Sequence, residues 1–396
     1  MTRQPRRRVL FADDQPDVAR TLAAALPQEQ YDVAHASDGE QALAMLTNGV
    51  FDLAVIDLRM PPGQWGGLWL LERLSERPGR HLALVLSGEA GMRETIQALR
   101  LGAVDFVVKD LAQAELAERV DECCRAAAQE RHRTVHVRLP RPVARAAAVL
   151  GTADGVDARA RAALEAVEAA LRFGGLAELA RRRVAGELDA ATMNRLASPS
   201  MGTWNDLCRR ANRSAAASRS SWTAVVDAVA AEPLVTARNA LAHGGQQSRD
   251  ALHDADGQAR RWLDRYFLAV ERKAPPAVAL AGALRYEPPA FQADVMLLMG
   301  PGQHSALTAI AHSAPLSTGR VYALGADGPA DLWPFVLAEE SSALGSYEVL
   351  LWDGFRPSTR GIVSDTDPAR HTATGTGERR MGLVAMADVL QRESGK

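Results

Sequence analysis

Short apolar runs in the first third of the chain each stop at a residue with a charged or nucleophilic side chain. These runs, with the residues that end them, are 8–12 with Asp13 and Asp14, 53–56 with Asp57, 82–86 with Ser87, and 103–108 with Lys109. Runs rich in Val, Ile and Leu are typical of buried parallel strands. Helical patterns alternate with them, at 16–25, 39–47, 67–75, 92–101 and 113–129. The alternation predicts a doubly wound α/β fold around a five-stranded parallel sheet.

The polar residues at the strand ends predict one reactive site. Ligands of open α/β sheets bind at the carboxyl ends of the strands, so Asp13, Asp14 and Asp57 should meet there. Three carboxylates repel one another unless a hard cation shares them, and Mg²⁺ accepts such ligands. The Ser87 hydroxyl can donate to a phosphoryl oxygen, and the Lys109 ammonium can offset charge added at Asp57.

These motifs strongly resemble the receiver domain of two-component response regulators, a flavodoxin-like fold. The resemblance rests on Asp13-Asp14, the sequence Asp-Leu-Arg-Met-Pro from Asp57, Ser87 before a glycine, and Lys109 after Phe106. It implies that Asp57 is the phospho-acceptor and that Asp13, Asp14 and Asp57 hold Mg²⁺. It also implies that Ser87 and Lys109 bind the phosphoryl group, that Phe106 is the switch aromatic, and that a sensor histidine kinase is the phosphodonor.

Two features depart from the family pattern. The loop 61–67 is a residue or two longer than the usual form, and Asp110 stands where the family usually has a proline. Neither change replaces a residue that is expected to take part in phosphorylation of Asp57. The alternative is a nucleotide-binding α/β domain with incidental carboxylates, but such a domain usually has a glycine-rich loop after its first strand, and this chain does not.

Periodicity divides the whole chain of 396 residues into several parts. The predicted parts are a receiver domain at 1–130, a basic linker at 131–153, an all-α bundle at 154–273, a small, mainly antiparallel β domain at 274–365, and a polar tail at 366–396 with a terminal helix at 382–393. Helical spacing in the bundle predicts helices at 157–173, 176–185, 201–212, 222–243 and 250–271. The pairs Gly174-Gly175 and Gly244-Gly245 are read as turns.

Composition limits which cell compartments and which binding partners are possible. A net charge of −2 argues against a protein that coats a polyanion. Three cysteines with irregular spacing fit neither a disulfide framework nor a zinc site. The basic start lacks the apolar segment of a signal peptide, and the apolar stretches are too short to span a bilayer. We therefore expect a cytoplasmic protein that does not enter the membrane.

A second motif lies in the expected bundle, where Arg238, Asn239 and His243 fall on neighbouring positions of one helix. It resembles the Arg-polar-x3-His signature of the HEPN superfamily, which includes metal-independent ribonucleases. The resemblance implies that His243 is a general acid or base, that Arg238 stabilises the phosphorane, and that Asn239 orients them. The alternative is a structural dimerisation bundle, since Arg and His near a helix end also complement its dipole.

The sequence therefore predicts a response regulator in which phosphorylation of Asp57 controls homodimerisation and the output of a HEPN-like domain, with RNA cleavage as the implied activity. A non-enzymatic, phosphorylation-dependent protein-interaction regulator is the alternative. A DNA-binding transcription factor ranks below both, because a compact helix-turn-helix with a basic recognition helix is not evident. Arginine clusters at 181–183 and 209–219 fit either RNA phosphates or solvated helix faces.

Overall fold

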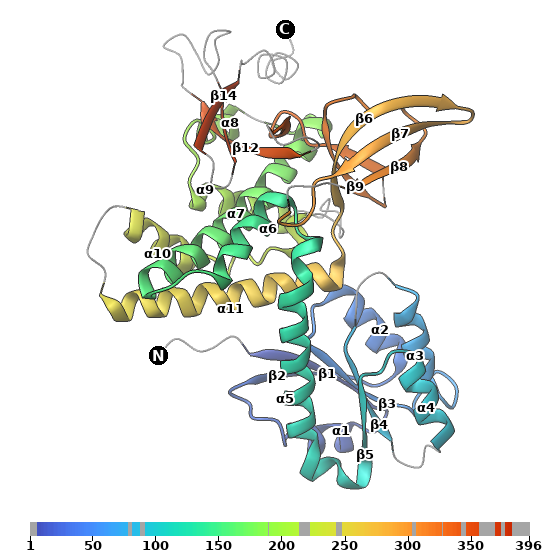
Figure 1. Cartoon of the computed structure of the whole chain (residues 1–396). Coiled ribbons are helices and arrows are strands. Elements are labelled where there is room, and N and C mark those ends of the chain that lie inside the picture. Colours follow the sequence, from blue (N-terminus) through green and yellow to red (C-terminus); the bar gives the residue numbers. More distant parts are fainter. Residues whose placement is uncertain are drawn as a thin grey trace. The chain divides into compact units, whose positions relative to one another are not determined.

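The structure, a computed structural model, divides into two compact units (Figure 1). The first comprises residues 1–134 and 267–274, and the second comprises 135–266 and 275–396. The residues described are 6–77, 81–87, 92–188, 190–213, 222–242, 248–302, 306–326, 328–341, 346–355, 369–373 and 377–381. Within them, no helix is long and apolar enough to cross a membrane.

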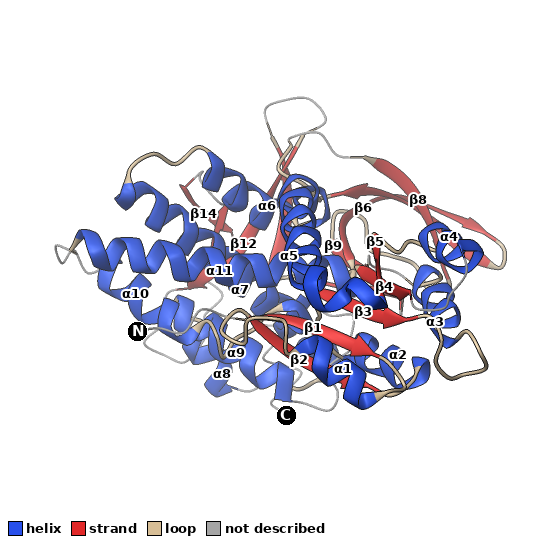
Figure 2. Cartoon of the chain, turned by 90° about the horizontal axis from the view of Figure 1, so that it is seen from below, coloured by secondary structure: helices blue, strands red, loops and turns tan. Residues whose placement is uncertain are grey.

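The first unit is a five-stranded parallel sheet with strand order β2-β1-β3-β4-β5 (Figure 2). The strands are β1 (Arg7–Ala12), β2 (Tyr31–Ala36), β3 (Leu53–Asp57), β4 (Ala83–Ser87) and β5 (Asp105–Val108). The helices are α1 (Pro16–Ala23), α2 (Gly39–Asn48), α3 (Gly66–Ser75), α4 (Met92–Arg100) and α5 (Lys109–Thr134). The predicted doubly wound parallel sheet is confirmed.

Successive side chains of β1 point to opposite faces of the sheet, which gives two hydrophobic cores. Leu10 and Ala12 pack in a core with α2 and α3, whereas Val9 and Phe11 pack in a core with α1 and α5. Strand β3 is buried along its whole length. This two-sided burial is why the central strands read as continuous apolar runs.

The last turns of helix α11 (Arg249–Lys273) belong to the first unit. Arg131, near the end of α5, forms an ion pair of 2.8 Å with Glu271. The Arg272 guanidinium donates to the backbone carbonyl of Phe51 at 3.3 Å and to that of Asp52 at 3.1 Å. Both carbonyls immediately precede β3, so the start of this strand is tied to a residue 220 positions further along the chain.

His81 lies beside this contact and should make the stability of the first unit depend on pH. Burial, followed by the positive charges of Arg272 and Arg77, lowers the pKa of His81 from 6.5 to about 4. Between these values the unfolded chain takes up a proton that the folded chain does not, so the free energy of unfolding falls as the pH falls. One proton is worth about 1.36 kcal/mol per pH unit, so the loss should reach up to about 3 kcal/mol.

Urea denaturation of wild type and His81→Gln at several pH values measures this dependence. The variant should lose less stability than wild type between pH 6.5 and about 4. Stability curves that run parallel for the two proteins would contradict the assignment.

Helices make up the first part of the second unit. They are α6 (Arg141–Ala148), α7 (Val156–Ala185), α8 (Ala190–Arg195), α9 (Met201–Arg213), α10 (Glu232–Ala242) and α11 up to Tyr266, with the 3-10 turns η1 (Val135–Arg138), η2 (Val149–Gly151) and η3 (Trp222–Val225). The helix expected at 222–243 is wrong in its first half, where η3 and a turn precede α10. His243 and Gly244-Gly245 lie outside the described residues.

The turn predicted at Gly174-Gly175 is also wrong, because both glycines lie inside the 30-residue helix α7. A Cβ atom on Gly174 would lie 3.3 Å from the Cys208 sulfur, and one on Gly175 would lie 3.1 Å from the Trp204 ring. Both neighbours belong to α9. The glycines therefore let two helices approach closely, and this packing outweighs their low helix propensity.

The stretch 131–153, predicted to be a basic linker, is mostly helical. It contains the end of α5, η1, α6 and η2. Arg141 within it is fully buried and donates to the backbone carbonyl of Tyr347 at 2.7 Å. Burial lowers the pKa of Arg141, and the charge of Arg145 lowers it further. The sequence gives no sign that Arg141 is buried, because the carbonyl that accepts from it lies 206 residues away.

Two antiparallel sheets follow the helices. One has the order β10-β9-β6-β7-β8 and the other the order β11-β12-β13-β14. The strands are β6 (Ala277–Glu287), β7 (Ala290–Leu297), β8 (Leu307–His312), β9 (Val321–Gly325), β10 (Gly328–Asp331), β11 (Val336–Glu340), β12 (Tyr347–Phe355), β13 (Ala369–Ala373) and β14 (Gly377–Met381). The expected antiparallel β region is present.

Strands β13 and β14 lie in the part predicted to be a polar tail. They pair with each other, and β13 also pairs with β12. Their sequences, Ala-Arg-His-Thr-Ala and Gly-Glu-Arg-Arg-Met, lack an alternating apolar pattern, so periodicity does not reveal them. The terminal helix expected at 382–393 lies outside the described residues.

Candidate functional site

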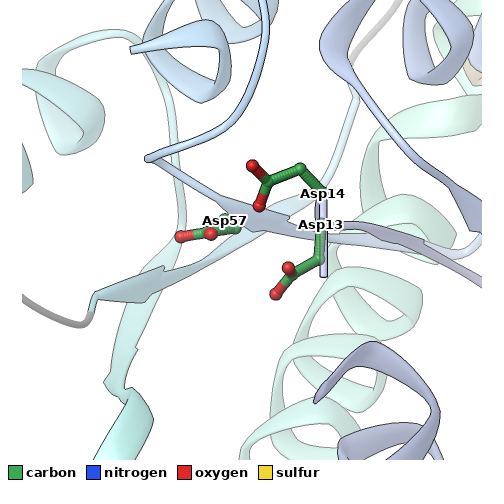
Figure 3. A group of neighbouring side chains, drawn as sticks. All are labelled: Asp13, Asp14 and Asp57. Carbon is green, nitrogen blue, oxygen red and sulfur yellow. The ribbon is translucent and has the colours of Figure 1, made fainter. Parts of the chain in front are cut away.

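Two acidic side chains meet where the neighbouring strands β1 and β3 end. The strands pair in register, with Ala12 opposite Ile56, so the next residues, Asp13 and Asp57, come side by side. Both carboxylates are buried, at 2% and 3% exposure. Asp14 is exposed, and the three carboxylates bring ligand atoms within 4.8 Å of one another (Figure 3). The acidic cluster expected from the sequence therefore forms.

Lys109 joins the two buried carboxylates. Its ammonium lies 2.8 Å from a carboxylate oxygen of Asp57 and 3.1 Å from one of Asp13. Lys109 is the first residue of α5 and directly follows β5, which places it at the same edge of the sheet. Burial alone would lower the pKa of Lys109, but the hydrogen bonds and charges of Asp57 and Asp13 outweigh burial and raise it. Lys109 therefore stays cationic in the site.

The environment of Asp57 favours reactivity. Burial raises the pKa of the Asp57 carboxyl, and the charge of Asp13 adds to the shift, although the Lys109 ammonium and the Arg59 amide oppose it. One Asp57 oxygen accepts from Lys109, and the other accepts from the Arg59 amide only weakly, at 3.3 Å. A raised pKa means that the anion is poorly stabilised and is a better nucleophile than an exposed carboxylate.

The donor set fits a hard divalent cation. All three ligands are carboxylates, and each offers an oxygen to a common centre. Mg²⁺ binds through a few carboxylates and keeps several waters, which suits a cluster with one exposed member, Asp14. One ammonium facing three carboxylates leaves an excess of negative charge, which a divalent cation would offset.

Three glycines fix the loop that leaves Asp57, and the sequence interpretation missed them. A Cβ atom on Gly67 would lie 2.3 Å from the carbonyl oxygen of Asp57, and one on Gly66 would lie 2.3 Å from that of Pro61. The Gly39 amide, at the start of α2, donates to the same Pro61 carbonyl at 2.8 Å. The signal that could have revealed them is the doublet Gly66-Gly67 directly after a strand and its loop.

The remaining predicted receiver residues lie on β4 and β5. Ser87 is the last residue of β4 and pairs with Val108 in the sheet, so its backbone lies at the same edge as Lys109. The Ser87 side chain lies outside the described residues. Phe106 is on β5, the outer strand of the sheet, and its ring is exposed.

A family model described as the response regulator receiver domain matches residues 9–121. These residues form a receiver domain. The match covers the β1 to α5 region, including every residue of the acidic cluster and Lys109. Receiver domains of two-component response regulators are phosphorylated on an aspartate.

Similar proteins each match over 30% of this chain or less. The regulator AlgB of Pseudomonas aeruginosa is 32% identical over 115 residues, which are 29% of this chain and 25% of AlgB. The response regulator GtcR of Aneurinibacillus migulanus is 34% identical over 119 residues, 30% of this chain and 48% of GtcR. PleD of Caulobacter vibrioides is 36% identical over 115 residues, 28% of this chain and 25% of PleD. The chain thus spans half or less of the length of these relatives.

Solved structures match a similar share of the chain. A CheY-like receiver domain protein of Methanospirillum hungatei is 27% identical and covers 32% of this chain and 99% of its own, with a TM-score of 0.30. The receiver domain of the Francisella response regulator 1452 is also 27% identical and covers 31% and 98% of the two chains, with a TM-score of 0.29.

The structure does not bring together the residues of the second predicted site, Arg238, Asn239 and His243, within its described part. Arg238 forms an ion pair of 2.8 Å with Glu168 of α7, Asn239 is exposed, and His243 lies outside the described residues. The Arg238 guanidinium is therefore already engaged by a carboxylate of its own unit.

The arginine clusters proposed for RNA are likewise paired within the chain. The described pairs are Arg181 with Glu178 and Glu187, Arg182 with Glu178, Arg183 with Asp331, Arg209 with Asp206 and Glu232, and Arg210 with Asp206. Of the other two arginines of the 209–219 cluster, Arg213 is exposed and Arg219 lies outside the described residues. Arginines that are neutralised in this way favour the interpretation as helix faces over phosphate binding.

Proposed function

We propose that Asp57 accepts a phosphoryl group from a sensor histidine kinase. The observation that carries the proposal is the position of the Lys109 ammonium. It lies 2.8 Å from a carboxylate oxygen of Asp57, the last residue of β3, and 3.1 Å from one of Asp13. An oxygen of the Asp57 carboxylate attacks phosphorus, the new O–P bond forms, and the N–P bond to the donor imidazole breaks. The imidazole leaves with the bonding electron pair.

Lys109 and the acidic cluster perform different parts of this reaction. The Lys109 ammonium contacts the carboxylate that becomes the acyl phosphate, so it offsets the negative charge added there. Asp13 holds Lys109 from the other side, and the Gln15 amide holds Asp13 at 2.8 Å. Asp13, Asp14 and Asp57 would hold Mg²⁺, which supplies positive charge to the transferring group.

Acetyl phosphate with magnesium chloride, followed by intact mass measurement, tests the acceptor. Wild type should gain the mass of one phosphoryl group, and Asp57→Asn should gain none, because an amide is not a nucleophile of this kind. Asp17→Asn, which alters an exposed acid of α1, is the matched control and should gain it as wild type does. Equal labelling of Asp57→Asn and wild type would overturn the assignment.

The output that we propose is homodimerisation through the face formed by α4, β5 and α5. In the described part of the receiver domain, the exposed large hydrophobic residues all belong to this face: Ile96, Leu99, Phe106, Val108 and Leu111. Ile96 and Leu99 are one turn apart on α4, and Phe106 and Val108 alternate on the outer strand. An apolar patch of this kind marks an interaction site.

Light scattering of the same samples measures this second step. The mass in solution should double for wild type in acetyl phosphate and should stay unchanged for Asp57→Asn. A mass that is independent of phosphorylation would separate dimerisation from Asp57 while leaving the acceptor assignment intact.

For the second unit we propose a phosphorylation-dependent contact with another protein. RNA cleavage by Arg238, Asn239 and His243 stays a prediction, and the Arg238–Glu168 ion pair gives it no added support. Addition of a labelled RNA to the phosphorylated protein would decide between the two outputs, since the protein-interaction proposal expects the RNA to remain intact.

A further inference from the structure

A cavity of about 520 Å³ lies inside the second unit. One wall is a face of α7, where Ala177, Ala180 and Val184 follow one another at helical spacing. The opposite wall is β9 and β10, with Ala323 and Pro329 among its residues. Trp222 of η3 and Pro276 complete the lining together with short side chains and glycines. The cavity exists because both walls carry small residues.

An ion-pair network joins the two walls. Asp331 of β10 accepts from Arg183 of α7 at 3.3 Å and from Arg320 at 2.7 Å, and the Trp333 amide donates to its other oxygen at 2.9 Å. Both guanidinium groups also lie over the Trp333 ring, at 5.4 Å and 4.5 Å from its centroid. These contacts fix the position of β10 against α7 at one edge of the cavity.

The charged residues that line the cavity are already neutralised. Glu178 accepts three hydrogen bonds, two from Arg181 and one from Arg182, at 2.8 to 3.0 Å. Arg181 has Glu187 as a second carboxylate partner, at 2.7 Å. Asp331 is paired with Arg183 and Arg320. A charged ligand would therefore have to break an existing ion pair, whereas a neutral ligand would not.

The mouth of the cavity presents an apolar side chain to solvent. Val184 lines the cavity and is 68% exposed, which is uncommon for a large aliphatic residue on a helix that buries most of its other apolar side chains. A ligand seated in the cavity would cover it. Burial of apolar surface at such a site is favourable.

We propose that this cavity binds a small, uncharged and mainly apolar molecule. The volume lies within the range of about 300–1,000 Å³ that is usual for ligand sites, and the lining combines apolar walls with a few polar groups at the edge. The second unit thus has a ligand site of its own, independent of Asp57.

Fluorescence titration of the full chain with phenylnaphthylamine, a neutral apolar probe, tests the proposal. Wild type should bind it saturably at one site, and its sulfonated analogue, anilinonaphthalene sulfonate, should bind at least about tenfold more weakly. Ala180→Trp places an indole in the cavity and should weaken binding of the neutral probe by about tenfold or more. Ala148→Trp, at an exposed position of α6, adds the same ring elsewhere and should bind as wild type does.

Circular dichroism shows whether each variant is folded. If Ala180→Trp does not fold, Ala177→Trp replaces it, because Ala177 is only partly buried and its indole can enter from the mouth. Asp57→Asn should bind the probe as wild type does, which separates this site from the receiver chemistry. The proposal is overturned if wild type shows no saturable binding, if the folded tryptophan variant binds as well as wild type, or if the sulfonated analogue binds equally well.

Discussion

Gly67→Ala should lower the free energy of unfolding of the receiver domain by about 3 kcal/mol, the upper part of the range for overpacked sites. The added Cβ would lie 2.3 Å from the carbonyl oxygen of Asp57 and 2.6 Å from the Cα atom of Leu58. Both are backbone atoms, one of the last residue of β3 and one of the residue that follows it, so no side chain can rotate away. The backbone itself would have to move.

The same substitution should slow phosphorylation under conditions where the variant is still folded, because the atom displaced belongs to Asp57. Urea denaturation followed by circular dichroism measures the stability, and acetyl phosphate labelling measures the reactivity. Gly151→Ala is the matched control, since a Cβ there has open space and its backbone angle suits alanine. An unfolding midpoint equal to that of wild type would show that the loop has more room than its backbone distances indicate.

Glu271→Ala should destabilise the receiver domain by about 3 kcal/mol, as expected when one partner of a buried ion pair is removed. The Arg131 side chain is 7% exposed and that of Glu271 is 16% exposed, so the substitution leaves a desolvated guanidinium without this carboxylate. Glu130→Ala is the control: its ion pair with Arg133, at 3.9 Å, is solvated, with Arg133 78% exposed. It should change stability by less than about 0.5 kcal/mol.

A double variant distinguishes the loss of the pair from a general disruption. Arg131→Met with Glu271→Leu removes both charges and keeps apolar volume, so it should recover most of the stability that Glu271→Ala loses. Urea denaturation of the full chains gives the comparison. If the double variant is as unstable as Glu271→Ala, the buried charge is not the cause.

The acidic cluster could be predicted from the sequence because the topology of a parallel sheet alone places the strand ends together. Parallel strands end at one edge of a sheet, so residues that follow separate apolar runs, such as Asp13, Asp57 and Lys109, can be placed together without knowing a distance. The contacts of Gly67 could not be derived in this way. They depend on how close two backbone segments approach, and the sequence shows only that two glycines are adjacent.

Other features were hidden because tertiary contacts override local preference. Gly174-Gly175 reads as a turn by propensity, yet the approach of α9 makes these glycines the residues that fit inside a long helix. The sequences of strands β13 and β14 lack an alternating apolar pattern, so their pairing is visible only from backbone register. The Arg131–Glu271 ion pair joins positions 140 residues apart, and no local pattern connects them.

That separation also sets an order of events during synthesis on the ribosome. Strand β5 is complete at Val108, but Glu271 and Arg272 emerge only after the whole helical part of the second unit, which ends at Tyr266, has been translated. At about 5–20 residues per second, the 140 residues between Arg131 and Glu271 take roughly 7–28 s. During that interval the first unit lacks the last turns of α11. A chaperone or protease could therefore bind the unfinished unit before residues 267–274 pack onto it.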